Sequence, residues 1–415
     1  MRVQVEPCCR VAVVYSVVSI AIIVGIFLYR QQIDSKTIKV RVSGTPFLKM
    51  QPSYNKRSSH EAFGNMTKTA GTQAKNIYFY NPQFYHVFTD WILDTWGTSK
   101  KFERCPVSDC IVTKGEVPME QIDAIIFKPR DMSDCPPNKP PGQVWIFAEF
   151  ETPHYYFQSK CFYELKNKIN WTMTYRRDAD FPIAHGYFRK SDKPKYTQKD
   201  LDDIYAKKNK TAVVFISHCP TVGKRLTFIE LLRSHGIQVD IFGSCGVMSV
   251  ECNNEDRYLL SFNVSGIVKP DCFSTVLSQY KFFLSLENSL CMDYTTEKSL
   301  HRVMRHPILP VIRDGSNATI FHPPHSYIYT GDFKSVQELA QHMKMLDGNK
   351  TAYLEYFKWK QHYHTEDMYQ EWNSAFCRLC ERLHNPEDYR RVYRDIAAWH
   401  ISPRGKHACH APTDL

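Results

Sequence analysis

The sequence of 415 residues lacks internal repeats and low-complexity tracts, and it has no large excess of charge of one sign. Lys and Arg number 53 against 43 Asp and Glu, which gives a formal net charge of +10. With 43% hydrophobic and 23% charged residues, the composition argues against collagen, a coiled coil, a disordered chain and a many-helix membrane protein. The modest positive charge leaves nucleic acids and anionic small molecules open as ligands. The length fits two or three domains.

Long apolar runs are also missing, with one exception at residues 11–29. This run, VAVVYSVVSIAIIVGIFLY, is long enough to cross a bilayer once. A cleaved signal peptide is the alternative, but the run is longer than a usual signal core and no clear cleavage site follows it. We therefore predict a cytosolic tail at 1–10, a transmembrane signal anchor at 11–29 and a polar stem at 30–72.

Cysteines and N-x-S/T sequons predict that the rest of the chain lies in an oxidising lumen. All of the 14 cysteines except Cys8 and Cys9 follow the anchor, and disulfides are typical of that compartment. Glycosylation would also require luminal exposure. The sequons begin at Asn65, Asn170, Asn209, Asn263, Asn317 and Asn349. This is the layout of a single-pass type II membrane protein.

After the stem, short β-rich apolar runs alternate with helical patterns, which predicts an α/β fold. We predict strands at 76–80, 124–127, 144–150, 171–175, 212–217, 238–243, 282–286 and 309–312, and helices at 224–234, 296–305 and 336–346. A Lys- and Asp-rich segment without apolar period, 191–210, predicts a linker between α/β domains at 73–190 and 211–360. We predict that residues 361–415, which are rich in aromatic residues, form a C-terminal tail with helices and disulfides. Two doubly wound domains facing across a cleft fit this pattern, because ligands bind at the carboxyl ends of parallel strands.

Two segments carry residues suited to chemistry. In the first, 217–225, Lys224 and Arg225 open a helix, where cations oppose the helix dipole unless an anion is bound. The alternative is that both side chains extend into solvent. In the second, 287–298, Thr295, Thr296 and Glu297 suit plain helix capping, which leaves Tyr294 and Lys298 unexplained. An amide, a phenol, a carboxylate and an ammonium at a strand end also suit a sugar nucleotide.

The stretch YKFFLSLENSLCMDYTTEK at 280–298 resembles the signature of the α1,3/4-fucosyltransferases, glycosyltransferase family 10. Supporting matches include NWTMTYRRDADF, VDIFGSCG and SYIYTGDFKSVQELAQHMKMLD, and the resemblance covers roughly 144–359. It implies a GT-B fold with an acceptor-side domain at 73–190 and a GDP-fucose-binding domain at 211–360. GDP-fucose would be the donor, with no tightly bound cofactor and no metal. The location implied is the Golgi membrane, with the catalytic domain luminal.

Carried over by position, the resemblance implies roles for individual side chains. Arg225 resembles the arginine on the diphosphate, and Lys298 would help neutralise the leaving group. The remaining donor-side residues implied are Asn288, Tyr294, Glu297, Tyr175 and Arg177. Asp178-Ala179-Asp180 mimics a D-x-D metal motif, but in this family the segment is metal-independent, so we interpret it as structural.

Glu151 is the candidate base, because Glu151-Thr152-Pro153 with His154 resembles the family's acceptor motif. A carboxylate after an apolar strand is partly desolvated, which raises its pKa and suits it to deprotonating a sugar hydroxyl. A surface glutamate is the bland alternative, and Glu149 is a competitor two residues earlier.

The sequence departs from the family pattern at three places. Thr152 stands for the usual serine, His154 comes one place early, and Arg313-Asp314-Gly315 replaces a frequent Gly-Pro pair. We predict an inverting fucosyltransferase that adds L-fucose in α1,3 linkage to a GlcNAc of a glycoprotein or glycolipid glycan. The alternatives are transfer to the core GlcNAc of an N-glycan, or a catalytically weak luminal glycan-binding homologue.

The last cysteines allow either zinc or disulfides. Cys377 and Cys380 form one close pair, and Cys409 is flanked by His407 and His410. A structural zinc site normally needs two close pairs of ligands, so disulfides are favoured. Their pairing cannot be read from the sequence.

Overall fold

The computed structural model describes residues 73–80, 102–113, 117–132, 134–136, 138–155, 160–191, 196–246, 272–303, 306–403 and 406–415. All of these residues belong to one compact unit, 63–415. The predicted tail at 1–10, anchor at 11–29 and stem at 30–72 lie outside the described residues. Among the helices that are described, none combines the length and the apolarity that crossing a membrane requires.

The first sheet has six parallel strands in the order β2-β1-β3-β4-β5-β6. The strands are β1 (Lys75–Phe79), β2 (Cys110–Thr113), β3 (Ala124–Phe127), β4 (Val144–Glu149), β5 (Trp171–Thr174) and β6 (Phe181–Pro182). Every residue of β3, β4 and β5 is buried, as expected for parallel strands that are covered on both faces. This explains their continuous apolar runs and confirms four of the predicted strands.

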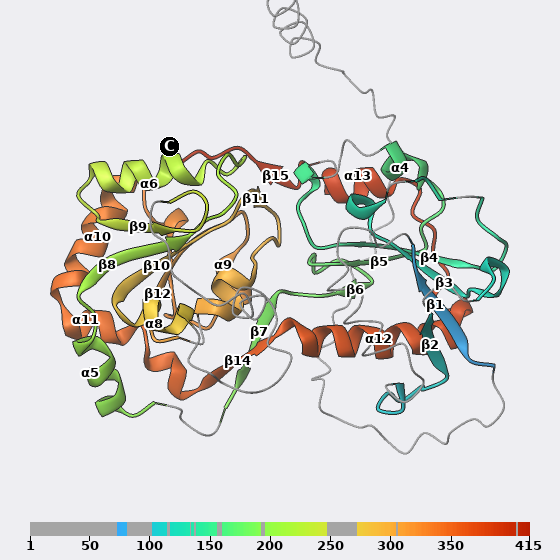
Figure 1. Ribbon diagram of the computed structural model, residues 1–415, viewed down its shortest axis with the longest axis horizontal. Coiled ribbons are helices and arrows are strands. Elements are labelled where there is room, and N and C mark those ends of the chain that lie inside the picture. Colours follow the sequence, from blue (N-terminus) through green and yellow to red (C-terminus); the bar gives the residue numbers. More distant parts are fainter. Residues whose placement is uncertain are drawn as a thin grey trace, which may run out of the picture. The chain divides into compact units, whose positions relative to one another are not determined.

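Helices from distant parts of the chain cover the first sheet (Figure 1). They are α4 (Lys160–Glu164), α12 (Met368–His384) and α13 (Ile396–Ile401), and short 3-10 turns lie at η1 (Met119–Gln121), η2 (Pro129–Asp131), η3 (Pro153–Tyr155) and η7 (Pro386–Tyr389). Trp372, Phe376 and Leu379 of α12 pack into the same core as β1 and β3. Much of the segment expected as a tail, 361–415, therefore builds the core of the first sheet.

The second sheet has five parallel strands in the order β13-β12-β10-β8-β9. They are β8 (Lys210–Phe215), β9 (Val239–Phe242), β10 (Tyr280–Leu286), β12 (Leu309–Arg313) and β13 (Ile328–Tyr329). The helices α6 (Arg225–Ser234), α10 (Val336–Gly348) and α11 (Lys350–Glu355) share its core (Figure 1). Gly236, with a φ of 79°, ends the turn after α6. The predicted α/β class and its β-α-β unit are confirmed.

The remaining elements are short. Helices α8 (Cys272–Ser278) and α9 (Ala318–Phe321) accompany the second sheet, together with η5 (Thr330–Asp332) and η6 (Lys358–Gln361). The helix predicted at 296–305 is a π-helix, η4 (Lys298–Val303). Two antiparallel pairs join β7 (Gly186–Lys190) to β14 (Tyr363–Asp367) and β11 (Leu290–Cys291) to β15 (Cys409–His410).

The segment predicted as a linker, 191–210, contains a helix, α5 (Gln198–Ala206). Thr197 and Asp200 form a capping box at its start, and Leu201 is its one buried residue. With so little apolar surface, the helix leaves no clear periodic signal in the sequence. The domain boundaries themselves stay a prediction.

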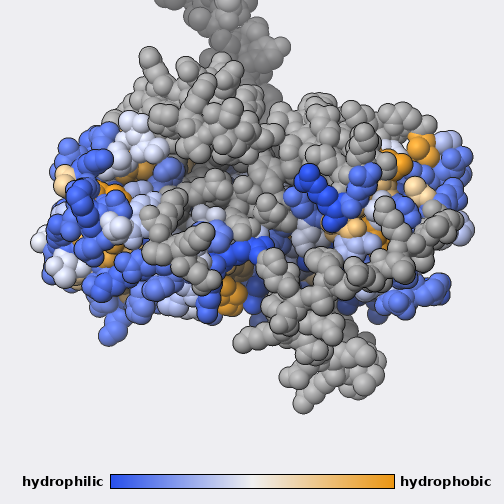
Figure 2. Space-filling model, turned by 90° about the horizontal axis from the view of Figure 1, so that it is seen from below, coloured by the Kyte–Doolittle hydropathy of each residue, from blue (hydrophilic) through white to orange (hydrophobic). Residues whose placement is uncertain are grey.

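The face in Figure 2 is mostly hydrophilic where it is described, with hydrophobic residues in small separate patches. The large hydrophobic side chains that are exposed come from scattered places in the sequence: Tyr163, Val222, Met292, Ile320, Met345, Val392 and Leu415. Scattered exposure of this kind is normal for a folded domain.

Candidate functional site

Polar residues gather beyond the carboxyl ends of strands from both sheets. Glu151 and Thr152 follow β4, and Tyr175 follows β5. The segment from Glu287 to Lys298 follows β10 of the second sheet. The carboxyl ends of parallel strands are where α/β folds bind ligands, so these segments define the candidate active site.

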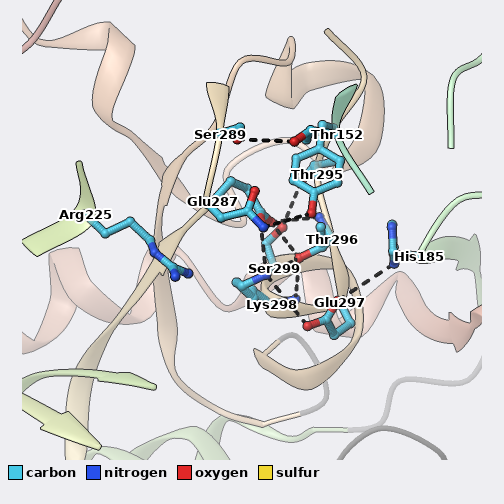
Figure 3. Close-up of polar contacts among 12 residues, drawn as sticks. Thr152, His185, Arg225, Glu287, Ser289, Thr295, Thr296, Glu297, Lys298 and Ser299 are labelled. Atoms are coloured by element: carbon cyan, nitrogen blue, oxygen red, sulfur yellow. Dashed lines mark hydrogen bonds and ion pairs between the residues drawn. The ribbon is translucent and has the colours of Figure 1, made fainter. Parts of the chain in front are cut away.

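Glu287 and Lys298 form its most buried ion pair (Figure 3). The Lys298 Nζ lies 3.0 Å from Glu287 Oε2, and the Glu287 side chain is 1% exposed. Glu287 Oε1 accepts hydrogen bonds from the backbone N and the Oγ1 of Thr296, at 2.9 and 2.7 Å. Burial lowers the pKa of Lys298, but the carboxylates of Glu287 and Glu297 outweigh this effect and raise it overall. Lys298 is therefore held as a charged, oriented ammonium.

Arg225 is the second buried cation near this pair. It is the first residue of α6 and extends toward Glu287 and Lys298 (Figure 3). Its Nη2 donates to the carbonyl of His218 at 2.6 Å, while its Nε finds no hydrogen-bond partner among the described residues. Burial lowers the pKa of Arg225, an effect that the nearby Glu287 carboxylate opposes. A guanidinium at a helix N-terminus whose Nε is still without a partner among the described residues is suited to an anionic ligand.

Glu151 meets residues of the donor signature. Tyr294 donates its hydroxyl proton to Glu151 Oε2 at 2.9 Å, and Asn288 Nδ2 donates to the Tyr294 hydroxyl at 3.4 Å. The other carboxylate oxygen of Glu151 lies 3.4 Å from Arg130 Nη1. Burial and the Glu151 carboxylate keep the pKa of Tyr294 well above its ordinary value, so this phenol stays a donor. Tyr175 packs edge-on against it, with ring centroids 5.1 Å apart.

Glu149, the competitor of Glu151, has a different environment. Its side chain is fully buried, and its Oε1 accepts hydrogen bonds from the backbone N of Phe150 and of Glu151, at 3.0 and 3.1 Å. Its Oε2 finds no hydrogen-bond partner among the described residues. Burial raises the pKa of Glu149 to about 7. The desolvation that the sequence predicted for Glu151 thus falls chiefly on Glu149, since the Glu151 side chain is 29% exposed.

Three further contacts join segments that are distant in the sequence. Thr152 Oγ1 donates to Ser289 Oγ at 3.2 Å, and His185 Nδ1 lies 3.8 Å from Glu297 Oε2 (Figure 3). Arg177, whose side chain is 53% exposed, pairs with Asp293 at 3.0 Å. Thr152, one of the departures from the family pattern, is therefore buried and bonded to the donor segment.

The structure thus brings together most of the predicted site residues. Glu151, Asn288 and Tyr294 share one hydrogen-bonded chain, with Tyr175 packed against it. Glu287, Arg130 and His185 also contact predicted site residues, although the sequence did not predict a role for them. Glu287 stood inside the quoted signature, whereas neither Arg130 nor His185 belongs to a recognisable motif.

The carboxylates of the D-x-D triplet are both engaged by the protein. Asp178 pairs with Arg176 at 2.6 Å, and Asp180 accepts from the backbone N of Thr172 and from the Tyr393 hydroxyl, both at 2.9 Å. These contacts fit the structural interpretation. The absence of a metal requirement stays a prediction.

Two groups of side chains in the described part of the chain have metal-ligand spacing, but disulfides occupy their sulfur atoms. They are Cys110, Cys380 and His384, and His154, Cys291 and Cys409. Cys377 is likewise bonded to Cys105. The preference for disulfides over zinc among the last cysteines is confirmed.

Four of the six sequons lie in described segments. Asn209, Asn317 and Asn349 are exposed. Asn170 is half-buried, and its Nδ2 donates to the carbonyl of Arg391 at 2.8 Å. Asn65 and Asn263 lie outside the described residues, and glycosylation of all six stays a prediction.

Family models match most of the folded part of the chain. The model described as glycosyltransferase family 10 (fucosyltransferase) C-term matches residues 205–399, and the fucosyltransferase, N-terminal model matches residues 72–186. A relative named alpha-(1,3)-fucosyltransferase C, from Drosophila melanogaster, is 33% identical over 337 residues, covering 74% of this chain and 73% of its own.

A second relative is similar over the same share of the chain, and a solved structure aligns with it at lower identity. The Bos taurus protein named 3-galactosyl-N-acetylglucosaminide 4-alpha-L-fucosyltransferase FUT3 is 31% identical, over 74% of this chain and 80% of its own. A crystal structure titled alpha1,3-fucosyltransferase with GDP-fucose aligns with 77% of this chain and 94% of its own, at 17% identity and a TM-score of 0.46.

Proposed function

Because the chain belongs to glycosyltransferase family 10, the fucosyltransferases, we propose that it is an inverting α1,3-fucosyltransferase that moves L-fucose from GDP-fucose to a GlcNAc residue of a glycan. One observation carries the proposal. The hydrogen bond from Tyr294 to Glu151 joins the candidate base, after β4, to the donor signature, after β10. A base must lie beside the donor for a sugar hydroxyl to attack it in line.

The arrangement of the two sheets supports a GT-B fold for this chain. Each sheet is parallel, and each contributes side chains beyond its strand ends to one cluster. In this proposal the first sheet carries the base and the acceptor, and the second sheet carries GDP-fucose. If the two substrates bind between the sheets, the acceptor and the donor can meet although each sheet binds only one of them.

Arg225 and Lys298 are the residues that would hold the diphosphate. As the bond from fucose C1 to the diphosphate breaks, negative charge develops on the departing GDP, and fixed cations stabilise that charge. The Glu287 carboxylate orients the Lys298 ammonium, and the Nε of Arg225 has hydrogen-bonding capacity to spare. Glu297 would accept hydrogen bonds from fucose hydroxyls.

Glu151 would act as the general base. It takes the proton from the acceptor hydroxyl as that oxygen bonds to fucose C1 and the bond from C1 to GDP breaks, with inversion at C1. The transition state resembles an oxocarbenium ion, as in inverting glycoside hydrolysis. Tyr294 and Arg130 hold the Glu151 carboxylate in one orientation, so less conformational entropy is lost when it engages the acceptor hydroxyl.

We place the enzyme in the Golgi membrane as a single-pass type II protein with its catalytic part in the lumen. Five disulfides in the described residues support an oxidising compartment. The exposed sequons at Asn209, Asn317 and Asn349 fit the same side of the membrane.

The test measures donor binding, turnover and linkage with the full chain. GDP-fucose is offered with an N-acetyllactosamine acceptor or with an N-glycan that has an exposed core GlcNAc. Released GDP is quantified, and mass spectrometry assigns the linkage of the product. Transfer to N-acetyllactosamine supports the proposal. Transfer to the core glycan alone would show that the acceptor is the core GlcNAc of an N-glycan. No turnover with either acceptor would indicate a catalytically weak homologue.

Glu151→Gln tests the base in the same assay. The amide keeps the size and one acceptor oxygen but cannot take a proton, so turnover should fall by about 10²-fold or more while GDP-fucose still binds. Glu120→Gln, at an exposed position, is the matched control and should behave as wild type. Wild-type turnover in the Glu151 variant would rule out the base, and a folded wild type that binds no GDP-fucose would rule out the donor.

A further inference from the structure

A buried arginine at the end of β12 links the donor side of the site to the last residues of the sequence. Arg313 is 1% exposed, and its Nε and Nη2 donate to the two carboxylate oxygens of Asp414, at 2.6 and 2.7 Å. Two parallel hydrogen bonds of this kind fix a guanidinium in one orientation. The pair joins residues that are 101 positions apart in the chain.

The third nitrogen of Arg313 reaches the loop that precedes Arg225. Nη1 donates to the carbonyl of Gly223 at 2.6 Å, and the guanidinium lies over the ring of Phe228 on α6, 4.6 Å from its centroid. The backbone N of Gly223 donates to the carbonyl of Asn288 at 2.7 Å. Arg313 thus fixes one side of Gly223, and the donor signature fixes the other.

The 406–415 segment is itself anchored beside the donor signature. Cys409 is bonded to Cys291, β15 pairs with β11, and the backbone N of Met292 donates to the carbonyl of Ala408 at 2.7 Å. These contacts hold the chain five residues before Asp414. Because these contacts already restrict the chain near Asp414, little further conformational entropy is lost when its carboxylate binds Arg313.

We propose that the 406–415 segment is a positioning element of the nucleotide site. Asp414 orients Arg313, Arg313 holds Gly223, and the fixed loop presents Arg225 to the diphosphate of the donor. This inference rests on the proposed function. It also gives Arg313, a departure from the family pattern, a specific task in this chain.

Two consequences follow from the geometry. Without the Asp414 charge, the buried guanidinium of Arg313 has no carboxylate to balance its charge. Other acceptors within its reach then compete with the Gly223 carbonyl for its hydrogen bonds. The loop then samples several positions, so GDP and GDP-fucose bind more weakly. Glu151 takes no part in these contacts, so turnover with saturating donor stays close to wild type.

The experiment uses Asp414→Asn in the full chain, with GDP as the binding probe. We expect the dissociation constant of GDP and the KM for GDP-fucose to rise about tenfold, with kcat within about twofold of wild type. Asp414→Glu keeps the charge and should recover most of the affinity. Glu387→Gln, which removes an exposed carboxylate paired with Arg390 at 2.6 Å, is the control and should change neither constant.

Hydrogen exchange tests the same contact without nucleotide. The amides of Gly223 and Lys224 donate to Asn288 and Thr221, and both should exchange faster in Asp414→Asn than in wild type. Unchanged exchange together with unchanged GDP binding would overturn the inference. If the wild type binds no GDP, the proposed function fails, and the exchange rates alone decide whether the segment holds the loop.

A paired variant covers the case in which Asp414→Asn does not fold. Arg313→Met with Asp414→Leu leaves no buried charge but still removes the donor to the Gly223 carbonyl. Weaker GDP binding by this folded variant supports the inference, and GDP binding equal to wild type contradicts it.

Discussion

Glu149 and Glu151 stand two residues apart and meet different surroundings. Glu151 is partly exposed and hydrogen-bonded to a phenol, which suits a carboxylate that must exchange a proton with a sugar. Glu149 is buried, and one of its oxygens accepts from two successive backbone amides, one of them the amide of Glu151. The residue that looked like a competitor for the base therefore supports the backbone on which the base is carried.

The buried carboxyl group of Glu149 should make the stability of the protein depend on pH. Its pKa rises from 4.5 to about 7 on folding, so between these values the unfolded chain releases the proton while the folded chain keeps it. The free energy of unfolding then falls as the pH rises through this window, by roughly 3 kcal/mol for this group. Glu149→Gln has no carboxyl group that titrates in this window. The free energy of unfolding of the variant, relative to that of wild type, should therefore increase as the pH rises from 4.5 to about 7.

Denaturant unfolding at several pH values measures this difference. Burial also raises the pKa of Asp314 to about 7, but both proteins share that group, so its contribution cancels in the comparison. Parallel stability curves for wild type and variant would contradict the assignment of the buried proton to Glu149.

At the scale of elements, the loop between β8 and α6 determines where Arg225 lies. Lys224 precedes the helix with a φ of 49°, and no side chain caps the first turn. The loop therefore depends on contacts from outside, and Gly223 makes two of them, to Asn288 and to Arg313. A Cβ at Gly223 would lie 2.8 Å from the Glu287 carbonyl oxygen and 3.0 Å from that of Asn288.

Gly223→Ala should consequently weaken donor binding. The obstructing atoms belong to the backbone, so the loop must move away from the donor signature, at a cost of about 1–3 kcal/mol. We expect a higher KM for GDP-fucose and lower thermal stability. Gly348→Ala is the matched control, because a Cβ there meets no atom within 4 Å, and it should leave both quantities near wild type. A Gly223→Ala variant with unchanged KM would show that the loop tolerates the shift.

Across the whole molecule, two disulfides join the edge strand β2 and the segment before it to α12. Cys105 pairs with Cys377 and Cys110 with Cys380, at sequence separations of 272 and 270. The two bridges close nearly the same loop, so either one alone preserves most of the constraint on the unfolded chain. Cys135 and Cys161 close a separate loop with a separation of 26.

This arrangement predicts an order of stabilities that differs from the order of loop lengths. Replacing Cys110 and Cys380 by Ala should cost less than replacing Cys135 and Cys161, whose loop is worth roughly 3–4 kcal/mol. Removing both long-range bridges should cost far more than the sum of the two single removals. Unfolding free energies of these four variants and the wild type measure this, and additive losses would show that the two long-range bridges do not share one loop.

Several features were predictable because their causes lie close together in the sequence. The apolar runs of β3, β4, β8 and β10 predicted buried parallel strands, and the spacing within 280–298 placed Asn288, Tyr294 and Lys298 at one strand end. The helix α5 was missed because a single buried leucine leaves no period, and β15 was missed because a two-residue strand carries no pattern.

The sequence by itself determined the α/β class, the family and the residues of the donor signature, since these follow from local periodicity and from motifs of neighbouring residues. Only the tertiary structure decided that Tyr294 bonds to Glu151, that Glu287 holds Lys298, and that Asp414 meets Arg313. The first and last of these contacts join residues more than 100 positions apart, and all three require buried polar groups to find partners in space. Which partner each of these groups meets depends on how the sheets and helices pack and how the disulfides join them, and no local sequence pattern predicts that packing.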